Sequence, residues 1–203
     1  MKPERRCGVL LHVSSLPCRH GQGDFGPQAH EFVDFLAEGG QSLWQVLPLG
    51  PVNAGAGNSP YSSYSAFAGN TLFISPDILV RQGILRARDV ENPPAFPDHR
   101  IDHAAATAWR TRILEQAFDN VFPRLRADGC FQQFCRDEAY WLDDYCLFMA
   151  LKGEQGGAPW YKWPRDLRLR EPEALGRARE RLGFDILRER YLQIGHHLSS
   201  PWC

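Results

Sequence analysis

The residues best suited to chemistry lie in one short stretch, residues 57–70, which reads GNSPYSSYSAFAGN. Its aromatic side chains, Tyr61, Tyr64 and Phe67, recur at every third position. A tyrosine offers a flat apolar face and a hydroxyl group, so it can pack against the C–H face of a sugar ring and hydrogen-bond to the sugar oxygens. The composition of this loop therefore predicts carbohydrate binding.

Short polar residues in the same loop add to this prediction. Asn58 and Ser59 can hydrogen-bond to a sugar held by Tyr61. The aromatic side chains have an alternative role, which is to anchor the loop to the rest of the fold. We expect the anchoring role for Phe67, weigh it evenly for Tyr64, and disfavour it for Tyr61. The predicted substrate-binding residues are Ser59, Tyr61, Asn58 and Tyr64.

A glycine motif offers a competing site. Gly21, Gly23 and Gly26 form G-x-G-x-x-G between a predicted strand and a predicted helix, as in dinucleotide-binding proteins. However, the segment SSLPCRH separates the motif from its strand, and no acidic residue follows the second strand in LPLGP, residues 47–51. Pro27 also removes a helix N-terminal N–H that a pyrophosphate would use. A nucleotide-dependent oxidoreductase is therefore a minor alternative.

Carboxylate pairs occur in two places, Asp137-Glu138 and Asp143-Asp144. Neighbouring side chains on a helix diverge by about 100°, so neither pair can converge on one bond. We expect all four to be surface charges. No serine lies in a G-x-S-x-G turn, so a serine nucleophile is not indicated either. The sequence predicts no catalytic residue within this chain.

Metal binding has little support in the sequence. His196 and His197 are adjacent, so their side chains diverge, and no acidic or cysteine ligand lies at metal spacing beside them. The six cysteines form no C-x-x-C motif. We expect no metal and no cofactor, and we expect reduced thiols in a cytoplasmic protein. The cysteines are Cys7, Cys18, Cys130, Cys135, Cys146 and Cys203.

Charge and composition exclude several classes of partner. Lys and Arg total 23 against 24 Asp and Glu, giving a net charge of −1, which argues against nucleic-acid binding. No stretch approaches the roughly 20 apolar residues of a membrane span. The N-terminal apolar run is short and interrupted by His12, so it reads as a buried strand rather than a signal peptide.

The elements that would position the aromatic loop form a βαβ unit. Short apolar runs at residues 7–13 and 42–49 predict two strands buried on both faces. Between them, an amphipathic pattern begins at Pro27 and ends at Gly39-Gly40, which predicts a helix. Such a unit has a parallel strand pair with a right-handed crossover. Ligands gather at the carboxyl ends of parallel strands, where the aromatic loop begins.

The rest of the chain reads as helix and loop. A proline-rich connector at residues 89–100 precedes predicted helices at 103–125 and 131–152. Residues 165–190 read as a solvated helical stretch with charges of both signs. The helix at 131–152 has one apolar face that we expect in the core: Trp141, Leu142, Tyr145, Phe148 and Met149.

Several segments, in order, resemble the 4-alpha-glucanotransferases, also called amylomaltases or disproportionating enzymes. The resemblance runs from about Arg6 to about Tyr191. The segments are HVSSLP (12–17), GQGDFGPQAHEFVDFLAEGGQSLWQVLPLGP (21–51), NSPYSSYSAFAGN (58–70), YWLDDYCLFMALK (140–152) and PWYKWP (159–164).

The resemblance implies an α/β fold, a (β/α)8 barrel with an inserted helical subdomain. It implies transfer of α-1,4-glucan segments between maltooligosaccharides by a retaining route, with one carboxylate as nucleophile, a second as acid and base, and a third orienting the sugar. No metal or organic cofactor takes part. Carried over to this chain, Ser59 and Tyr61 would contact the sugar next to the bond that breaks.

Two departures from the family pattern matter. The family often has Tyr-Gly before the Asn-Ser-Pro-Tyr segment, whereas this chain has AGAG at residues 54–57. The resemblance also places all three carboxylates on later strands, beyond residue 203. We therefore expect an N-terminal portion with an incomplete barrel, truncated and inactive in isolation.

The expected organisation has three parts. Residues 1–75 form the first βαβ unit with the aromatic loop, residues 76–192 form a mostly helical inserted subdomain with following helices, and residues 193–203 are a tail without family likeness. The expected function is that of a 4-alpha-glucanotransferase acting on maltooligosaccharides or α-glucan. The main alternative is a non-catalytic α-glucan-binding module.

Overall fold

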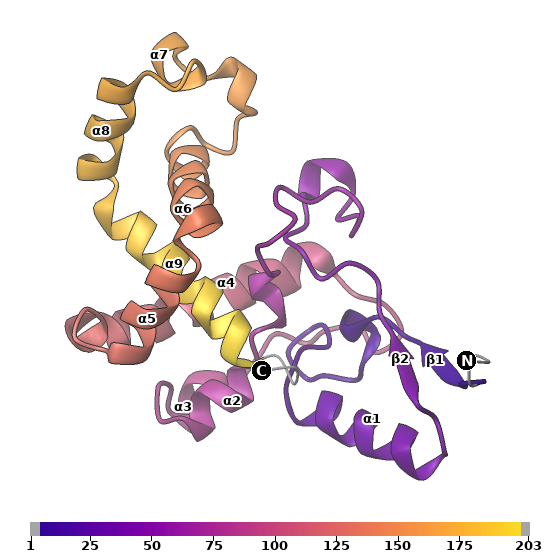
Figure 1. The fold of residues 1–203 in the computed structure, drawn as a ribbon. Coiled ribbons are helices and arrows are strands. Elements are labelled where there is room, and N and C mark those ends of the chain that lie inside the picture. Colours follow the sequence, from indigo (N-terminus) through magenta and orange to yellow (C-terminus); the bar gives the residue numbers. More distant parts are fainter. Residues whose placement is uncertain (1–4, 200–203) are drawn as a thin grey trace. The chain divides into compact units, whose positions relative to one another are not determined.

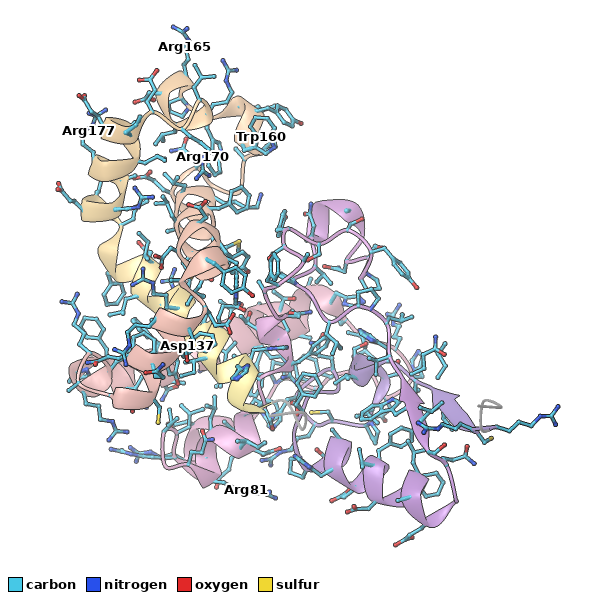
Figure 2. All side chains as sticks on the ribbon, viewed as in Figure 1. Arg81, Asp137, Trp160, Arg165, Arg170 and Arg177 are labelled. Carbon is cyan, nitrogen blue, oxygen red and sulfur yellow. The ribbon has the colours of Figure 1, made fainter. Side chains whose placement is uncertain are left out.

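The computed structural model describes residues 5–199. Figure 1 shows the ribbon and Figure 2 adds the side chains. By packing, the chain divides into two compact units. Within the described residues, unit 1 comprises 5–123 and 195–199, and unit 2 comprises 124–194. The domain boundaries expected from the sequence, at residues 75 and 192, are a different division and stay predictions.

Unit 1 begins with the expected parallel strand pair. Strand β1 (Gly8–Leu10) pairs in parallel with β2 (Leu43–Gln45), and Val9 lies opposite Trp44. Helix α1 (Pro27–Glu38) connects them (Figure 1). It begins at Pro27, where a missing N–H costs no helical hydrogen bond, and Gly39 caps its other end. The predicted strand–helix–strand order and the helix bounds are confirmed.

The strands are shorter and more exposed than predicted. Each has three residues, and every residue of both strands is exposed except the half-buried Trp44. Val9, Leu10 and Leu43 are 37%, 58% and 49% exposed. The prediction of strands buried on both faces is wrong for residues 5–199, because such burial requires further strands and helices on each face, and this part of the chain supplies a sheet of two strands.

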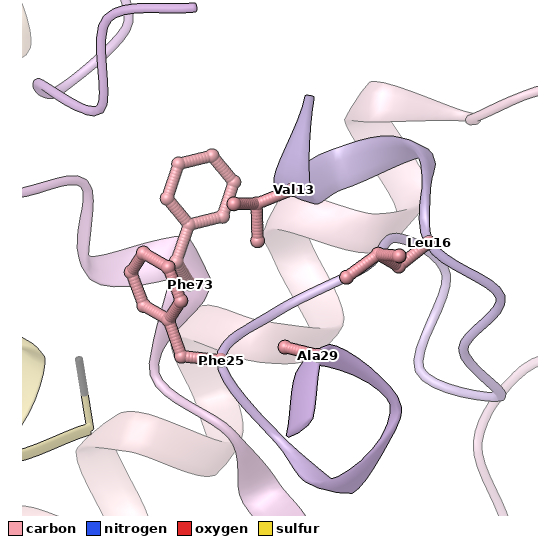
Figure 3. Packing of buried hydrophobic residues seen from close by; sticks show 5 residues of the cluster. All are labelled: Val13, Leu16, Phe25, Ala29 and Phe73. Atoms are coloured by element: carbon pink, nitrogen blue, oxygen red, sulfur yellow. The ribbon is translucent and has the colours of Figure 1, made fainter. Parts of the chain in front are cut away.

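The apolar residues that follow β1 leave the strand and enter the core. Val13 lies in a short 3-10 helix, η1 (Val13–Ser15), and is buried together with Leu16. Figure 3 shows both residues packed with Phe25, Ala29 and Phe73. The Phe25 and Phe73 rings meet edge to face, with centroids 5.8 Å apart. Burying side chains of this size stabilises the fold by roughly 1.5–3 kcal/mol each.

The remaining helices of unit 1 follow the aromatic loop. They are α2 (Pro76–Arg81), α3 (Ala87–Val90) and α4 (His103–Leu125), whose last two residues belong to unit 2. The bounds of α4 confirm the predicted helix at 103–125. Its buried face includes Ala106, Arg110, Ile113 and Ala117.

Unit 2 is built from helices. They are α5 (Gly129–Asp137), α6 (Ala139–Glu154), α7 (Arg165–Arg168), α8 (Pro172–Arg181) and α9 (Gly183–Ser199), of which α9 continues into unit 1. The single helix predicted at 131–152 is wrong, since α5 and α6 are separated at Glu138, where ψ is 5°. The Glu138 carboxylate accepts a hydrogen bond from the Trp141 indole, which stabilises the new helix start.

The buried face of α6 is broader than predicted. Leu142 and Tyr145 are buried as expected, whereas Trp141, Phe148 and Met149 are half-buried. The other buried residues of α6 are Cys146, Leu147, Ala150 and Leu151. No helix within residues 5–199 combines the length and apolar character needed to cross a bilayer.

The predicted charged stretch at 165–190 is mostly helical and carries exposed and half-buried ion pairs. Arg177 contacts Asp166 at 3.5 Å, and Arg188 contacts Asp185 at 3.0 Å. Arg181 joins α8 to Glu154 of α6 at 2.7 Å. The prediction of a helical stretch laced with opposite charges is confirmed, but the stretch is solvated only in part, because Ile186 and Leu187 are buried and Glu189 is half-buried.

Candidate functional site

The aromatic loop has a fixed base. The N–H of Asn70 donates to the carbonyl of Leu49 at 2.8 Å, which brings the two ends of residues 50–69 together. The buried Asn70 side chain also accepts from the N–H of Leu72 and caps the 3-10 helix η3 (Thr71–Phe73). A loop closed in this way loses less conformational freedom when it binds a ligand.

The tip of the loop is a turn that presents Tyr61. The Ser59 carbonyl accepts from the N–H of Ser62 at 3.1 Å, and Pro60 occupies the second position of this turn. The Ser59 hydroxyl oxygen accepts from the Tyr61 N–H at 3.3 Å. Tyr61 is 73% exposed, so its ring face is open to solvent. The structure therefore brings together two of the predicted site residues.

Asn58 lies beside this turn in an unusual backbone conformation. Its φ is 56°, in the left-handed region that asparagine tolerates better than most residues. Its N–H donates to the Asn53 carbonyl at 3.0 Å, which holds the conformation. The side chain of Asn58 is half-buried next to Ser59.

Of the other two aromatic residues, Phe67 departs from the expectation and Tyr64 does not. Phe67 is 61% exposed, so the prediction that it anchors the loop is wrong. The N–H groups of Phe67 and Ala68 both donate to the Ser65 hydroxyl, which fixes the backbone with the Phe67 ring outward. Tyr64 is half-buried, and this burial raises the pKa of its hydroxyl. The three-residue spacing was the signal that Phe67 could belong with Tyr61.

A buried arginine holds the segment after the loop, and sequence reasoning missed it. Arg110 is 1% exposed. Its guanidinium donates to backbone carbonyls on both sides, namely those of His20, Gln22, Leu72 and Ile74. One side chain thus joins the glycine loop to η3, where the aromatic loop ends. The signal was its position on the apolar face of α4, one turn from Ala106 and Ile113.

The charge of Arg110 is balanced by Asp24. The two side chains meet at 2.9 Å, and Asp24 is also buried. The other carboxylate oxygen of Asp24 accepts from the N–H of Gly26 at 2.8 Å. Burial, together with the Asp24 charge, raises the pKa of the adjacent Cys18 thiol to about 11. The site's support is therefore a desolvated ion pair surrounded by backbone carbonyls.

The same geometry argues against a nucleotide at the glycine motif. The N–H groups of Gly23 and Phe25 donate to the carbonyls of Ser14 and Phe73, so they are not presented to a phosphate. A Cβ at Gly23 would lie 2.0 Å from the Val13 carbonyl oxygen, so glycine is needed there for close backbone packing. The loop's carbonyls face a cation, which is opposite to the polarity of an anion site.

A cavity of about 750 Å³ lies in unit 1 away from the aromatic loop. It is lined by residues 14–19, 21 and 22, and by residues 96–101 at the end of the proline-rich connector. None of the predicted site residues lines it. The sequence reading did not anticipate this cavity, which forms only because two distant loops meet.

Within the described residues, no three His, Cys, Asp or Glu side chains gather as metal ligands. His196 is half-buried. Its burial, and to a smaller extent the charge of the nearby His197, lower the pKa of His196 to about 4. The five cysteines in this part of the chain are free thiols. Cys203 lies outside the described residues.

Comparison with known proteins decides the family. A family model described as 4-alpha-glucanotransferase matches residues 11–199. The chain belongs to the 4-alpha-glucanotransferase family. The match extends to Ser199, so it includes the first residues of the segment in which we expected no family likeness. In the structure, residues 193–199 continue helix α9, and the His196 ring meets that of Phe25 at 5.6 Å.

Individual 4-alpha-glucanotransferases match over most of this chain. The enzyme of Synechocystis sp. is 44% identical over 194 residues, covering 94% of this chain and 38% of the relative. The Thermus thermophilus enzyme is 44% identical over 190 residues, covering 92% of this chain and 36% of the relative. The chain therefore spans less than two fifths of the length of these relatives.

A solved 4-alpha-glucanotransferase structure has the same fold. The amylomaltase from Streptococcus agalactiae, in complex with acarbose, superposes with a TM-score of 0.91 at 35% identity. The match covers 97% of this chain and 39% of that protein. The mostly helical structure with a small parallel sheet is thus that of an amylomaltase over the matched region.

The carboxylate pairs of this family member are used structurally. Asp143 and Asp144 are exposed and pair with Arg190 at 2.7 Å and Arg170 at 2.9 Å. This confirms them as surface charges. Asp137 is exposed and accepts from Gln133, whereas the half-buried Glu138 departs from the expected exposure.

Proposed function

We propose that this chain contributes the glucan-holding loop of a 4-alpha-glucanotransferase, which transfers α-1,4-glucan segments between maltooligosaccharides. The observation that carries the proposal is Tyr61, 73% exposed at the tip of a turn with a fixed base. It occurs in a chain 44% identical to two 4-alpha-glucanotransferases. An exposed tyrosine on a rigid turn can accept a sugar face with little loss of conformational entropy.

The polar residues of the turn have distinct proposed roles. The Ser59 hydroxyl oxygen accepts from the Tyr61 N–H, so its own O–H remains able to donate to a sugar oxygen. Asn58 offers an amide with both donors and an acceptor beside it. The half-buried Tyr64 keeps its proposed role in substrate binding, and Phe67 joins Tyr61 as a second exposed ring face.

The proposed fold is the N-terminal part of a (β/α)8 barrel that is incomplete in this chain, with residues 76–192 as a mostly helical inserted subdomain and the helices that follow it. The parallel pair β1–β2 supports this, because its exposed residues Val9, Leu10 and Leu43 have the apolar character of buried barrel strands. The likeness to the S. agalactiae amylomaltase over 39% of that protein is consistent with this proposal.

We propose that the chain alone is inactive and that the nucleophile and the acid–base carboxylate of the retaining mechanism lie outside residues 1–203. Asp24, Asp143 and Asp144 each pair with an arginine, so they are poor candidates for those roles. The reaction needs no cofactor, and the protein is proposed to act in the cytoplasm. Turnover of maltotriose by the purified chain would contradict the inactivity.

A chimera tests the function directly. Residues 11–199 would replace the matching segment of the Synechocystis 4-alpha-glucanotransferase, and maltotriose disproportionation would be measured. We expect the chimera to transfer glucan and Tyr61→Ala within it to lower kcat/KM by about five- to tenfold, the loss of one aromatic contact. Tyr140→Ala, an exposed tyrosine in unit 2, is the matched control. A folded chimera in which both substitutions have equal effects would refute the role of Tyr61.

A further inference from the structure

Unit 2 contains a small cavity that the proposed function does not use. Its volume is about 210 Å³, and helix α6, the 3-10 helix η4 (Trp160–Lys162) and helices α7 and α8 contribute to its walls. The apolar part of the lining includes Phe148, Leu151, Trp163 and Leu175. Figure 2 labels two rim residues of this cavity, Trp160 and Arg170.

The cavity has a fixed aromatic wall and an exposed aromatic rim. Trp163 is 7% exposed, and its indole N–H donates to the Ala158 carbonyl at 2.9 Å. Its ring lies against that of Phe148, with centroids 5.5 Å apart. Trp160, in contrast, is 55% exposed. A rigid wall beside an accessible indole face is an arrangement that can hold a flat ring without first rearranging.

An exposed ion pair completes the lining. The Arg170 guanidinium contacts the Asp144 carboxylate at 2.9 Å, and the two side chains are 61% and 59% exposed. Arg170 has a φ of 58°, a left-handed conformation that is unfavourable for an arginine. Two backbone hydrogen bonds hold this conformation at the end of α7: the Arg170 N–H donates to the Leu167 carbonyl at 3.1 Å, and the Glu171 N–H donates to the Asp166 carbonyl at 2.9 Å. This helix-ending turn fixes where the Arg170 side chain leaves the backbone.

Aromatic faces beside planar polar groups are the chemistry that recognises a sugar ring. The C–H face of the ring packs on an indole, while guanidinium and carboxylate groups hydrogen-bond to its hydroxyls. The cavity is smaller than the roughly 300–1,000 Å³ of pockets for drug-sized ligands, which suits one ring of a longer chain. Asp144 is already paired and faces no second carboxylate in the lining, so the arrangement binds rather than cleaves.

We propose that this cavity, with Trp160 as platform and the Arg170–Asp144 pair as polar rim, is a second α-glucan-binding site in the helical unit. The choice of α-glucan as the ligand rests on the proposed function. The site lies within unit 2, whereas the aromatic loop lies within unit 1. With this site, the protein binds a glucan chain at a second place besides the aromatic loop.

The test is affinity electrophoresis of the purified full chain in gels containing glycogen, which gives an apparent Kd from the retardation. Trp160→Ala is expected to weaken binding about five- to tenfold, the effect of one aromatic contact. Tyr140→Ala, which is 72% exposed in the same unit and does not line the cavity, should leave binding unchanged. Tyr61 does not line this cavity, so we expect the effects of Trp160→Ala and Tyr61→Ala on the binding free energy to add in the double variant.

A third variant separates binding from folding. Arg170→Gly removes the guanidinium and relieves the left-handed strain, so it should weaken glycogen binding while Tm is unchanged or higher. Equal retardation of Trp160→Ala and Tyr140→Ala would overturn the second site. If Tyr61→Ala still weakened binding in that case, the proposed function would stand alone. If neither Tyr61→Ala nor Trp160→Ala altered the retardation, both the second site and the proposed role of Tyr61 would be refuted.

Discussion

The two units use the same residue type in opposite ways. In unit 1, Arg110 is 1% exposed and organises loops through its guanidinium. In unit 2, arginines such as Arg177 lie on the surface of helices whose backbone groups already hydrogen-bond within the helix (Figure 2). The Arg177 side chain is 62% exposed. A loop-built region must satisfy its buried carbonyls with something other than regular secondary structure. The comparison teaches that one buried cation can do this for several loops at once.

The energetic consequence depends on burial rather than on the number of ion pairs. Removing one partner of a buried pair leaves an uncompensated charge away from water, whereas exposed pairs contribute little. Most ion pairs in the described residues are in unit 2, yet the pair with the largest expected effect is Arg110–Asp24 in unit 1. Substitutions at a buried and at an exposed arginine, and changes of pH, test this contrast.

The largest effect is expected for Arg110→Met. Methionine has a helix propensity like that of arginine, so α4 itself should form. Asp24 would be left buried and four carbonyls would lose a donor, so unit 1 should lose about 3–5 kcal/mol. Hydrogen exchange followed by mass spectrometry, which resolves peptides of each unit, measures this loss.

The result that would contradict this prediction concerns the peptides of unit 1. If peptides of residues 5–123 in Arg110→Met kept the protection of the parent protein, the arginine would not be the organising group of unit 1. Asp24→Asn provides a graded comparison, because it removes the charge but keeps the shape. It should cost less than Arg110→Met, since the carbonyl contacts of Arg110 remain.

An intermediate effect is expected from pH, with opposite signs in the two units. In unit 1, burial lowers the pKa of His196 to about 4 from 6.5, so only the unfolded chain gains a proton between these values. Unit 1 should therefore lose stability as pH falls from about 6.5 to 4. In unit 2, burial raises the pKa of Glu189 to about 7 from 4.5, so unit 2 should lose stability as pH rises from about 4.5 to 7.

Neutral replacements should flatten each profile. His196→Gln should remove much of the stability that unit 1 loses at low pH. Glu189→Gln should stabilise unit 2 at pH 8 by about 1–2 kcal/mol, which is the free energy expected from the pKa shift, reduced because Glu189 is partly exposed. Amide hydrogen-exchange rates, divided by the intrinsic rate at each pH, measure the stability of each unit. Parallel pH profiles for the two units would show that these two groups do not dominate.

The smallest effect is expected for Arg177→Met, the same substitution on an exposed helix face. Arg177 lies 3.5 Å from Asp166 and 3.9 Å from Glu173. Loss of such exposed contacts should change the stability of unit 2 by no more than about 0.5 kcal/mol. Urea unfolding of the parent and the variant would measure it. A loss comparable to that of Arg110→Met would abolish the contrast between the units.

Sequence periodicity predicted the elements that are stabilised locally. The bounds of α1 followed from Pro27, Gly39-Gly40 and a 3.6-residue repeat, and the predicted helix at 103–125 coincides with α4. The break at Glu138 was missed, because the apolar pattern continues across it while the backbone does not. The first strand was predicted too long for a related reason, since Val13 is apolar but packs in the core cluster and not in the sheet.

The candidate site was predicted less completely than the helices. Tyr61 and Ser59 could be chosen from composition, because an Asn-Ser-Pro-Tyr turn has local rules. The exposure of Phe67 depends on Ser65 hydrogen bonds that no periodicity reveals. The contacts of Arg110 join residues 36 to 90 positions away. Such contacts depend on tertiary packing, although an arginine on an apolar helix face was a visible sign.

The route of α9 has a consequence for synthesis on the ribosome. Gly69 packs so closely on His196 that a Cβ would lie 2.0 Å from the Nδ1 atom, and both belong to unit 1. Unit 1 is therefore discontinuous, and its last segment emerges only after residues 124–194. At about 5–20 residues per second, the ribosome takes roughly 6–25 s to add the residues that separate Gly69 from His196. The helical unit has the opportunity to fold first during translation, and the N-terminal unit closes last.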